Sequence, residues 1–356
     1  MRFIFKAHND QDIQIVKHGG QAFWYGLLGV VLLTAPLWVG DYWLSQLSFV
    51  LIYVVAGLGL MVLSGFTGLA PIGHAAFLGV AAYVEAVLAA RGWPFLVSMA
   101  LAGALSAAVG VVVGLPALRV KGICLAIATL SFGFIVEEVL ARWESVTKGN
   151  AGLSVTTPQL FGLDLGSTEA FCFIALALCG LVTLAVLNLL RSATGRAFIA
   201  IGDSEVSAQS MGIYLAGYKT LAFALPAAIV SLAGALYANK LRFISPDQFG
   251  IAQSIDLLLV VGGLGSVHGA FLGAIFLITV PQLIALGNDW LPPAIGQATG
   301  LQAVAYRLVL MGFVLFEPMG LYGRWLKLRT WLQLSPFYRR GLFRRQKSYA
   351  KSERLK

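Results

Sequence analysis

Charge is scarce in this chain of 356 residues. Only 12% of the residues are Asp, Glu, Lys or Arg, whereas about a quarter of an ordinary soluble domain is charged. Apolar residues make up 58%, and the mean hydropathy is +0.82. This composition excludes a water-soluble globular domain. The apolar runs continue for about 20 residues instead of alternating over about 10, so they predict an all-α polytopic membrane protein and not a β-barrel.

Cysteines and catalytic motifs are also few. The three cysteines, Cys124, Cys172 and Cys179, all fall in apolar runs and lack metal-ligand spacing. The sequence contains no G-x-x-x-x-G-K-S/T phosphate loop, no H-E-x-x-H, no nucleophile elbow and no dinucleotide fingerprint. We therefore expect that the chain is no enzyme and binds no cofactor itself. If ATP drives transport, partner subunits must bind the ATP and Mg.

Ten apolar stretches each approach the length that crosses a hydrocarbon core. They cover residues 22–39, 44–63, 69–90, 95–115, 122–141, 170–190, 220–239, 251–267, 268–287 and 303–317. A polar arm, residues 1–21, precedes the first stretch without a clean cleavage site, so we expect an uncleaved first span. The expected organisation is this cytoplasmic arm, a transmembrane permease domain over 22–318, and a basic cytoplasmic tail over 319–356.

Positive charge is distributed unevenly among the loops. With the N-terminus in the cytoplasm, an even number of spans puts 19 of the 25 Lys and Arg residues on the cytoplasmic side, eleven of them in the tail. Topology thus explains the net charge of +9 better than nucleic-acid binding does. The tail combines Trp325, Leu328, Trp331 and Leu332 with basic residues, a pattern typical of an interfacial helix and an arm attracted to anionic membrane lipid.

One polar passage, residues 191–219, interrupts the apolar runs on the basic side. In it, Asp203 is expected to cap a short helix, Glu205 to lie in the first turn, and Gly212 after Met211 to end the helix. A helix of about two turns is unstable alone in water. Either neighbouring loops or a second protein must hold it, and we interpret it as a handle for a soluble partner.

Glycines are concentrated at two places, 57–79 and 262–273. Both predict broken helices, which often form transport pathways, although small residues also serve close helix packing. The two places share the pattern His-x-Ala-Phe-Leu-Gly, which begins at His74 and at His268. We expect each imidazole to bond a loosened backbone carbonyl. Six of these glycines are candidates for lining the translocation pathway: Gly65, Gly68, Gly73, Gly262, Gly263 and Gly265.

Carboxylates within the apolar runs are costly and need partners. Glu137 and Glu138 can pair with Arg142 one helical turn away. Glu85 and Asp256 have no obvious partner in the sequence, so we expect them to line a polar pathway. These two carboxylates and the broken helices also leave open an ion-coupled secondary transporter. A membrane-embedded enzyme lacks the clustered His, Cys or carboxylate residues that it would need.

Five ordered blocks carry a family resemblance. They are GLGLMVLSGFTGLAPIGHAAFLGVAAY, LPALRVKGICLAIATLSFGFIVEEVL, GRAFIAIGDSEVSAQSMGIYLAGYKTLAFALPAAIVSLAGALYA, SIDLLLVVGGLGSVHGAFLGA and FEPMGLYGRW, and they cover most of residues 57–324. The chain resembles the LivM-type permeases of bacterial branched-chain amino acid ABC importers. The N-terminal arm and the basic tail fall outside this resemblance.

The resemblance implies a multi-pass subunit of the bacterial inner membrane. Its implied partners are a LivH-type second permease, two cytoplasmic ABC ATPase subunits and a periplasmic substrate-binding protein. In this family, the loop corresponding to Gly195–Gly212, which includes Arg196, is the element that meets the ATPases. Related systems carry aliphatic amino acids, amides, urea and aromatic acids. A branched-chain or other neutral amino acid is expected here as the commonest substrate.

Overall fold

In the computed structural model, the described residues are 19–316 except 70, 119, 121, 158, 161, 162, 165, 261–265 and 289–299, together with positions 323, 325, 328 and 331. The long helices are α2 (Gly19–Trp38), α3 (Asp41–Leu60), α4 (Ala75–Ala90), α5 (Phe95–Ala117), α6 (Ile123–Arg142), α8 (Thr168–Arg191), α11 (Leu215–Leu241), α13 (Val267–Asn288) and α15 (Leu301–Phe316). Shorter ones are α7 (Glu144–Thr147), α9 (Ala193–Asp203), α10 (Glu205–Ser210) and α12 (Ile251–Val260).

Irregular and extended elements are short. Helix α3 runs into the π-helical turn η1 (Met61–Phe66), and the 3-10 turns are η2 (Gly149–Ala151) and η3 (Pro246–Phe249). Strand β1 (Leu153–Ser154) pairs antiparallel with β4 (Phe243–Ile244), and β2 (Gln159–Leu160) pairs antiparallel with β3 (Leu163–Asp164). The described part of the chain is thus helical, with two minimal ladders.

Six described helices are long and apolar enough to cross a membrane: Asp41–Phe66, Phe95–Pro116, Ile123–Arg142, Thr168–Arg191, Leu215–Leu241 and Val267–Gly287. Three further apolar helices are shorter, at Phe23–Trp38, Ala75–Ala90 and Gln302–Phe313. This supports an all-α membrane protein.

One expected span differs from the observed helix, and a second is described only in part. The span expected over 69–90 begins as a helix only at Ala75, because residues 67–69 and 71–74 are not helical. Helix α12 has ten residues, which is about 15 Å, half of a hydrocarbon core. Residues 261–265 of the stretch predicted over 251–267 lie outside the described residues, so a continuous crossing there stays a prediction.

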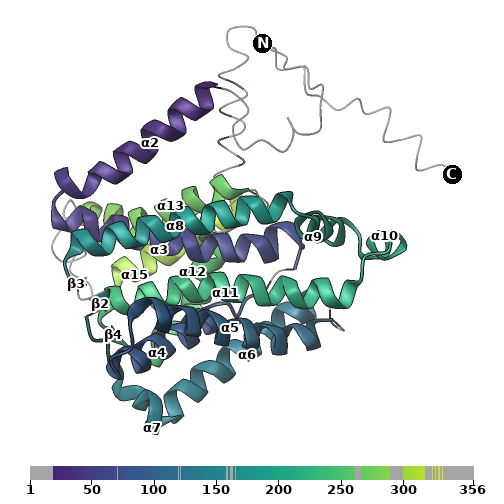
Figure 1. The fold of residues 1–356 in the computed structure, drawn as a ribbon, viewed down its shortest axis with the longest axis horizontal. Helices are drawn as coiled ribbons and strands as arrows, with labels where there is room; N and C mark the ends of the chain where they lie inside the picture. Colours follow the sequence, from purple (N-terminus) through teal and green to yellow (C-terminus); the bar gives the residue numbers. More distant parts are fainter. Residues whose placement is uncertain are drawn as a thin grey trace.

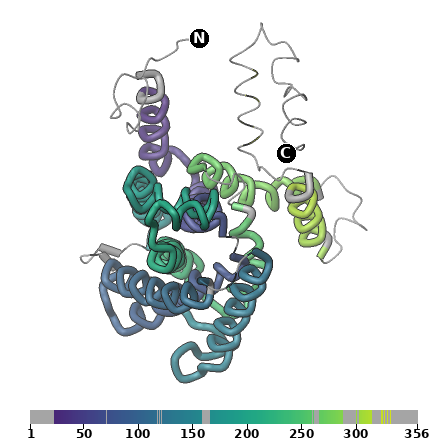
Figure 2. Tube along the Cα trace, turned by 90° about the vertical axis from the view of Figure 1, so that its right-hand side faces the viewer, coloured from purple at the N-terminus to yellow at the C-terminus, as the bar shows by residue number. Residues whose placement is uncertain are grey.

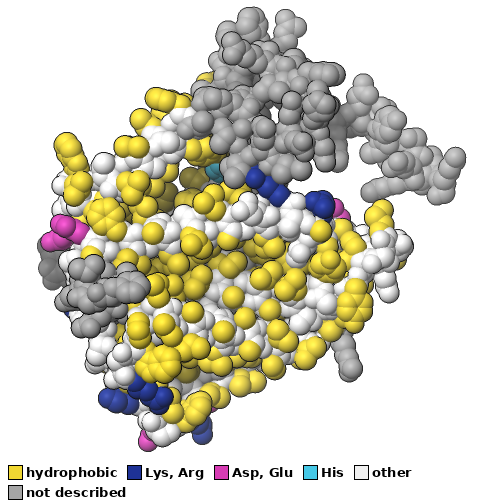
Figure 3. Space-filling view, in the orientation of Figure 1, with side chains coloured by type: hydrophobic (Ala, Val, Ile, Leu, Met, Phe, Trp, Pro, Cys, Tyr) yellow, Lys and Arg dark blue, Asp and Glu magenta, His cyan; other side chains and the backbone are white. Residues whose placement is uncertain are grey.

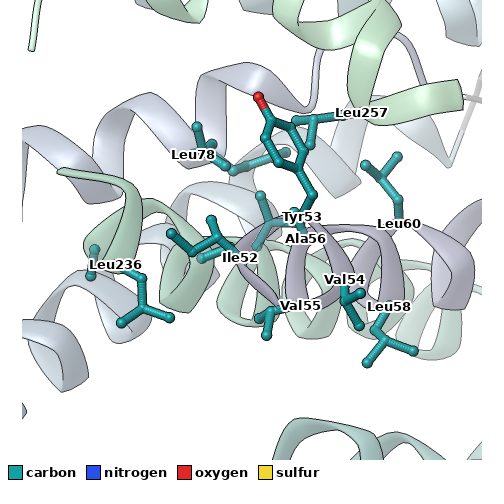
Figure 4. Close-up of a cluster of buried hydrophobic side chains, with 14 of the residues drawn as sticks. Ile52, Tyr53, Val54, Val55, Ala56, Leu58, Leu60, Leu78, Leu236 and Leu257 are labelled. Atoms are coloured by element: carbon teal, nitrogen blue, oxygen red, sulfur yellow. The ribbon is translucent and has the colours of Figure 1, made fainter. Parts of the chain in front are cut away.

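The core is centred on α3, whose residues are buried on every side from Leu51 to Leu63. Figure 4 shows part of it, with Tyr53 of α3 beside Leu257 of α12, and Ile52 of α3 on the side of Leu236 of α11. Helix α11 packs against α5, α4 and α3. Small residues permit this close approach. A Cβ added at Gly110 of α5 would lie 2.8 Å from the Cβ of Ala227.

The two ends of the helical bundle differ. Helices α9 and α10 project at one end, and the strands and the C-terminal end of α4 lie at the other (Figure 1). The face drawn in Figure 3 is largely apolar across its middle, and its charged side chains gather toward the two ends. Helices α2 and α15 lie at the periphery of the bundle (Figure 2). This distribution suits a bundle with lipid around its middle and water at its ends.

Candidate coupling and pathway site

Helix α9 begins in a tight turn that directly follows α8. The Ser192 hydroxyl accepts a hydrogen bond from the Gly195 amide at 3.3 Å and so caps α9. A Cβ at Gly195 would lie 2.3 Å from the carbonyl oxygen of Leu189, so only glycine fits this turn. Arg196 Nη1 donates to the carbonyl oxygen of Arg191 at 2.9 Å, where the end of α8 favours a cation. The point where α9 leaves the bundle is therefore fixed by Gly195 and Arg196. Both residues are predicted to belong to the coupling element.

One face of α9 is held by the bundle. Gly195, Ala197, Phe198 and Ile201 are buried. The Phe198 ring meets the ring of Tyr218 of α11 edge-on, with 6.4 Å between centroids. The sequence left open what holds the polar passage over 191–219. For α9, the helical bundle provides this support.

Helix α10 starts one residue later than the sequence predicts. Ser204, with an extended backbone, caps α10 by accepting from the Ser207 amide at 3.3 Å. Asp203 is instead the last residue of α9 and is exposed. The prediction of Asp203 as the N-cap is wrong, because the chain folds into two short helices with their break at Ser204.

The end of α10 agrees with the prediction. Gly212 has a φ of +84° and its amide donates to the carbonyl oxygen of Gln209, while the Ile213 amide donates to that of Ala208. These two bonds form a Schellman motif, which needs a left-handed residue after the cap. Met211 is the C-cap.

A buried ion pair connects α10 to α11. Lys219 Nζ lies 2.7 Å from Glu205 Oε1, and the two side chains are 3% and 20% exposed. The sequence marked Glu205 only for its place in the first turn and counted Lys219 among the charges of the loops. Their separation of fourteen positions, across a turn, gives no helical spacing that could have predicted the contact.

The outer side of this short helix is apolar and exposed. Val206 is 77% exposed, Met211 82% and Tyr214 72%. We call these three residues the coupling tip. Large apolar side chains exposed together mark interaction sites, so the tip is suited to docking in an apolar groove.

Helix α9 approaches the backbone of the broken part of the α3–α4 connection closely. A Cβ built on Gly202 would lie 2.4 Å from the carbonyl oxygen of Phe66, and one built on Gly68 would lie 3.5 Å from the Cα of Gly202. Gly68 has a φ of +66°. The predicted coupling element and the predicted break are thus in direct contact, although about 135 positions separate them.

The same break is fastened to two other helices. The Ile72 amide donates to Thr129 Oγ1 of α6 at 3.1 Å, and the Ala75 amide donates to Ser254 Oγ of α12 at 3.3 Å. A Cβ at Gly73 would lie only 1.8 Å from the carbonyl oxygen of Thr129. The crevice between these elements, lined by Gly73, Gly133, Glu137, Gly250, Ser254 and their neighbours, has no room for a water molecule. The break is therefore tightly packed against α6 and α12, with no space for water between them at this point.

The two histidines lie in different surroundings. His74 precedes α4, is 1% exposed, and meets the ring of Phe77 edge-on. Neither ring nitrogen has a hydrogen-bond partner among the described residues, so the predicted bond to a loosened carbonyl is not found there. His268, in the first turn of α13, shares a 2.8 Å hydrogen bond between its Nε2 and the hydroxyl of Tyr25 of α2.

Both carboxylates that lacked partners in the sequence have them in the fold. Glu85 of α4 is 1% exposed, and its Oε1 accepts from Asn239 Nδ2 of α11 at 3.1 Å, with Ser98 of α5 close by. Asp256 Oδ1 of α12 lies 3.4 Å from Arg307 Nη1 and 3.4 Å from the hydroxyl of Tyr306, both on α15. The sequence offers no obvious partner for either carboxylate because these partners are distant along the chain. Their predicted position along a polar pathway stays a prediction.

The remaining predicted residues have different outcomes. Arg142 pairs with Glu138 as expected, at an exposed site. The Glu137 carboxylate instead approaches Gly250, where an added Cβ would lie 3.0 Å from its Oε2. Gly65 lies within η1, next to the break. Gly262, Gly263 and Gly265, predicted as the second break, lie outside the described residues.

Comparison with known proteins gives one matching family, described as "Branched-chain amino acid transport system / permease component", whose model matches residues 42–317. The high-affinity branched-chain amino acid transport system permease protein LivM of Escherichia coli K12 is 34% identical over 267 residues, covering 67% of this chain and 63% of the relative. The LivM protein of Salmonella typhimurium matches to the same extent.

A further relative is the autoinducer 2 import system permease protein LsrC of Enterobacter sp. 638, 27% identical over 277 residues, 73% of this chain and 76% of the relative. The match spans less than two thirds of the length of the two LivM proteins. No solved structure matches the chain.

Proposed function

This chain belongs to the family of permease components of branched-chain amino acid transport systems, and we propose that it is the transmembrane subunit of a bacterial inner-membrane ABC importer. Its substrate is a branched-chain or other neutral amino acid, or a related small amide or carboxylate. The observation that carries the proposal is the contact between Gly202 of α9 and the break at Phe66–Gly68. Through it, a load on the cytosolic end reaches the interior of the bundle.

We infer the proposed partners from the absence of a phosphate-loop motif in the sequence and from the apolar side chains that the bundle exposes. Two ABC ATPase subunits bind ATP and Mg and dock on the coupling tip. A LivH-type permease covers part of the apolar surface, and a periplasmic binding protein delivers the substrate. Large apolar side chains are widely exposed on α5 and α6, among them Leu105, Val112, Ile127 and Ile135, which fits burial by lipid or by a second permease.

We propose ten apolar segments in the membrane, with both termini in the cytoplasm. The β1–β4 ladder supports this topology, since it joins the 143–169 segment to the end of α11. Helices α9 and α10 lie at the opposite end of the bundle (Figure 1). Alternating access then consists of ATPase closure pulling α9 and α10, with the break over 67–74 opening or sealing the pathway.

An ion-coupled secondary transporter was the alternative considered from the sequence. It drew on the carboxylates of Glu85 and Asp256, which lacked partners in the sequence. In the structure, Asp256 pairs with the cation of Arg307, and Glu85 Oε1 accepts a hydrogen bond from Asn239, so both carboxylates make contacts between helices. No observation in the described residues therefore favours this alternative over the ABC importer.

The test is reconstitution of the chain with its genomic-neighbour ATPases, second permease and binding protein in proteoliposomes. We expect uptake of radiolabelled leucine, or of another neutral amino acid from a panel, that requires internal ATP and is blocked by vanadate. Met211→Asp puts a charge on the coupling tip and should abolish ATP-dependent uptake. Leu184→Asn, on the exposed surface of α8, is a control away from the tip. Uptake by the chain alone that is abolished by a protonophore and insensitive to vanadate would refute the proposal.

A further inference from the structure

We propose that the buried ion pair between Glu205 and Lys219 is the link through which displacement of α10 moves α11. This inference rests on the proposed function and assigns the transmission step to two positioning residues. Neither residue is expected to touch the substrate.

The burial of Lys219 needs an explanation. Lysine near a helix end normally extends its ammonium group into water. Lys219 lies in the first turns of α11, at the polar end of the bundle, yet its side chain is 3% exposed. Taking two charges out of water costs several kcal/mol per ion before their attraction offsets it, so such a pair adds little stability compared with apolar residues. A fixed geometry between two elements is the better-supported use.

Helix α10 needs such a link because it is short and is joined to its neighbours through non-helical residues at both ends. It has six residues, too few for a helix that is stable by itself. Before it, Ser204 is extended, with a φ of −163° and a ψ of 115°. After it, Gly212 has a φ of +84°. A load on the coupling tip would turn α10 about these two residues unless a side-chain contact fixed it to the bundle.

The Glu205–Lys219 pair supplies that contact at 2.7 Å. Ala208, 1% exposed, adds a small apolar contact on the same helix. A charge-assisted bond at this distance resists separation of the two helices more strongly than one methyl group does.

Helix α11 is suited to carry the motion onward. It has 27 residues, about 40 Å at the usual rise per residue, which is enough to span the hydrocarbon core. Along this length it packs against α5, α4 and α3. Near its far end Asn239 bonds Glu85 of α4, and β4 follows directly. A shift at Lys219 therefore reaches the opposite end of the bundle through one continuous helix.

The experiment measures uptake per ATP hydrolysed by the complete complex in proteoliposomes. The variants are Glu205→Gln, Lys219→Met, the double variant with both changes, and the reversed pair Glu205→Lys with Lys219→Glu. The double variant matters most, because it removes the link without leaving an unpaired buried charge. Glu169→Gln is the control, an exposed carboxylate in the first turn of α8 and outside the coupling element. Co-purification with the ATPases reports assembly in every case.

We expect Glu205→Gln, Lys219→Met and the double variant to lower uptake per ATP by about fivefold or more, as for a contact-coupled pair, while ATP hydrolysis continues. The reversed pair should recover a substantial part, and Glu169→Gln should match the wild type. A double variant that assembles and keeps the wild-type ratio would overturn the inference. So would a double variant that fails to assemble, because the pair would then serve assembly and not transmission. Absence of ATP-dependent uptake in the wild-type complex would refute the proposed function instead.

Discussion

Gly73 offers the sharpest test of the packing around the break. In Gly73→Ala the new Cβ would lie 1.8 Å from the carbonyl oxygen of Thr129 and 2.7 Å from its carbonyl carbon. These are backbone atoms of α6, so no rotamer change can relieve the overlap. The break and α6 must separate by about 1.5 Å to reach ordinary van der Waals contact.

This separation has a calculable cost. Overpacking of a tight interior typically costs about 1–3 kcal/mol. The hydrogen bond from the Ile72 amide to Thr129 Oγ1, 3.1 Å long, lies beside the overlap, and its loss adds about 1 kcal/mol. The total is about 2–4 kcal/mol. At about 2.1 cal/mol/K of unfolding entropy per residue, a chain of this length would show a fall of about 3–5 °C in the melting temperature.

The assay is the thermal midpoint of the purified complex in detergent, followed by ATP-dependent uptake after reconstitution. Gly103→Ala is the matched control, since it also adds a methyl group to an interior glycine, but its nearest contact is Ser231 Oγ at an ordinary 3.5 Å. We expect Gly73→Ala to lower both midpoint and uptake and Gly103→Ala to change neither by much. Equal midpoints for the two variants would refute the packing described for the break.

Three further outcomes are expected. Arg307→Met should lower the thermal midpoint more than the double variant with Asp256→Asn, because the single change leaves the Asp256 carboxylate, 14% exposed, without its cation. Glu85→Gln should be tolerated, since its amide can donate to Asn239 Oδ1, which has no partner among the described residues, whereas Glu85→Leu should cost about 1–3 kcal/mol in thermal stability. Gly212→Ala should raise hydrogen exchange across α10 severalfold, because a φ of +84° costs an alanine about 1–2 kcal/mol.

The sequence predicts the continuous spans well. The expected stretches 95–115, 122–141 and 170–190 agree with α5, α6 and α8 to within two residues at each end. Uninterrupted hydrophobicity decides both where such a helix lies and how long it is. The stretch 69–90 is less well predicted. In it, glycines, a proline and polar contacts with other helices keep the backbone out of the helix before Ala75.

The sequence could not predict the partners of the buried polar groups, because those partners are distant along the chain. Asn239 is 154 positions from Glu85, and Arg307 is 51 positions from Asp256. Periodicity reports only neighbours within one helix. Capping at Ser204 was missed because Asp203 beside it is an equally good cap by residue type, and only the course of the chain out of α9 decides between them.

The register of the β1–β4 ladder gives experimental control over one end of the molecule. Ser154 and Phe243 face each other across this antiparallel pair, where opposite Cα atoms lie about 4.5–5.5 Å apart, within the range that a disulfide can bridge. Cysteines placed at these two positions would form a reversible staple between the loop after α6 and the base of α11. Forming this disulfide would fix that end, and reducing it would release it, while the end that carries α9 and α10 stays unmodified. Comparing the two states would show which end moves first.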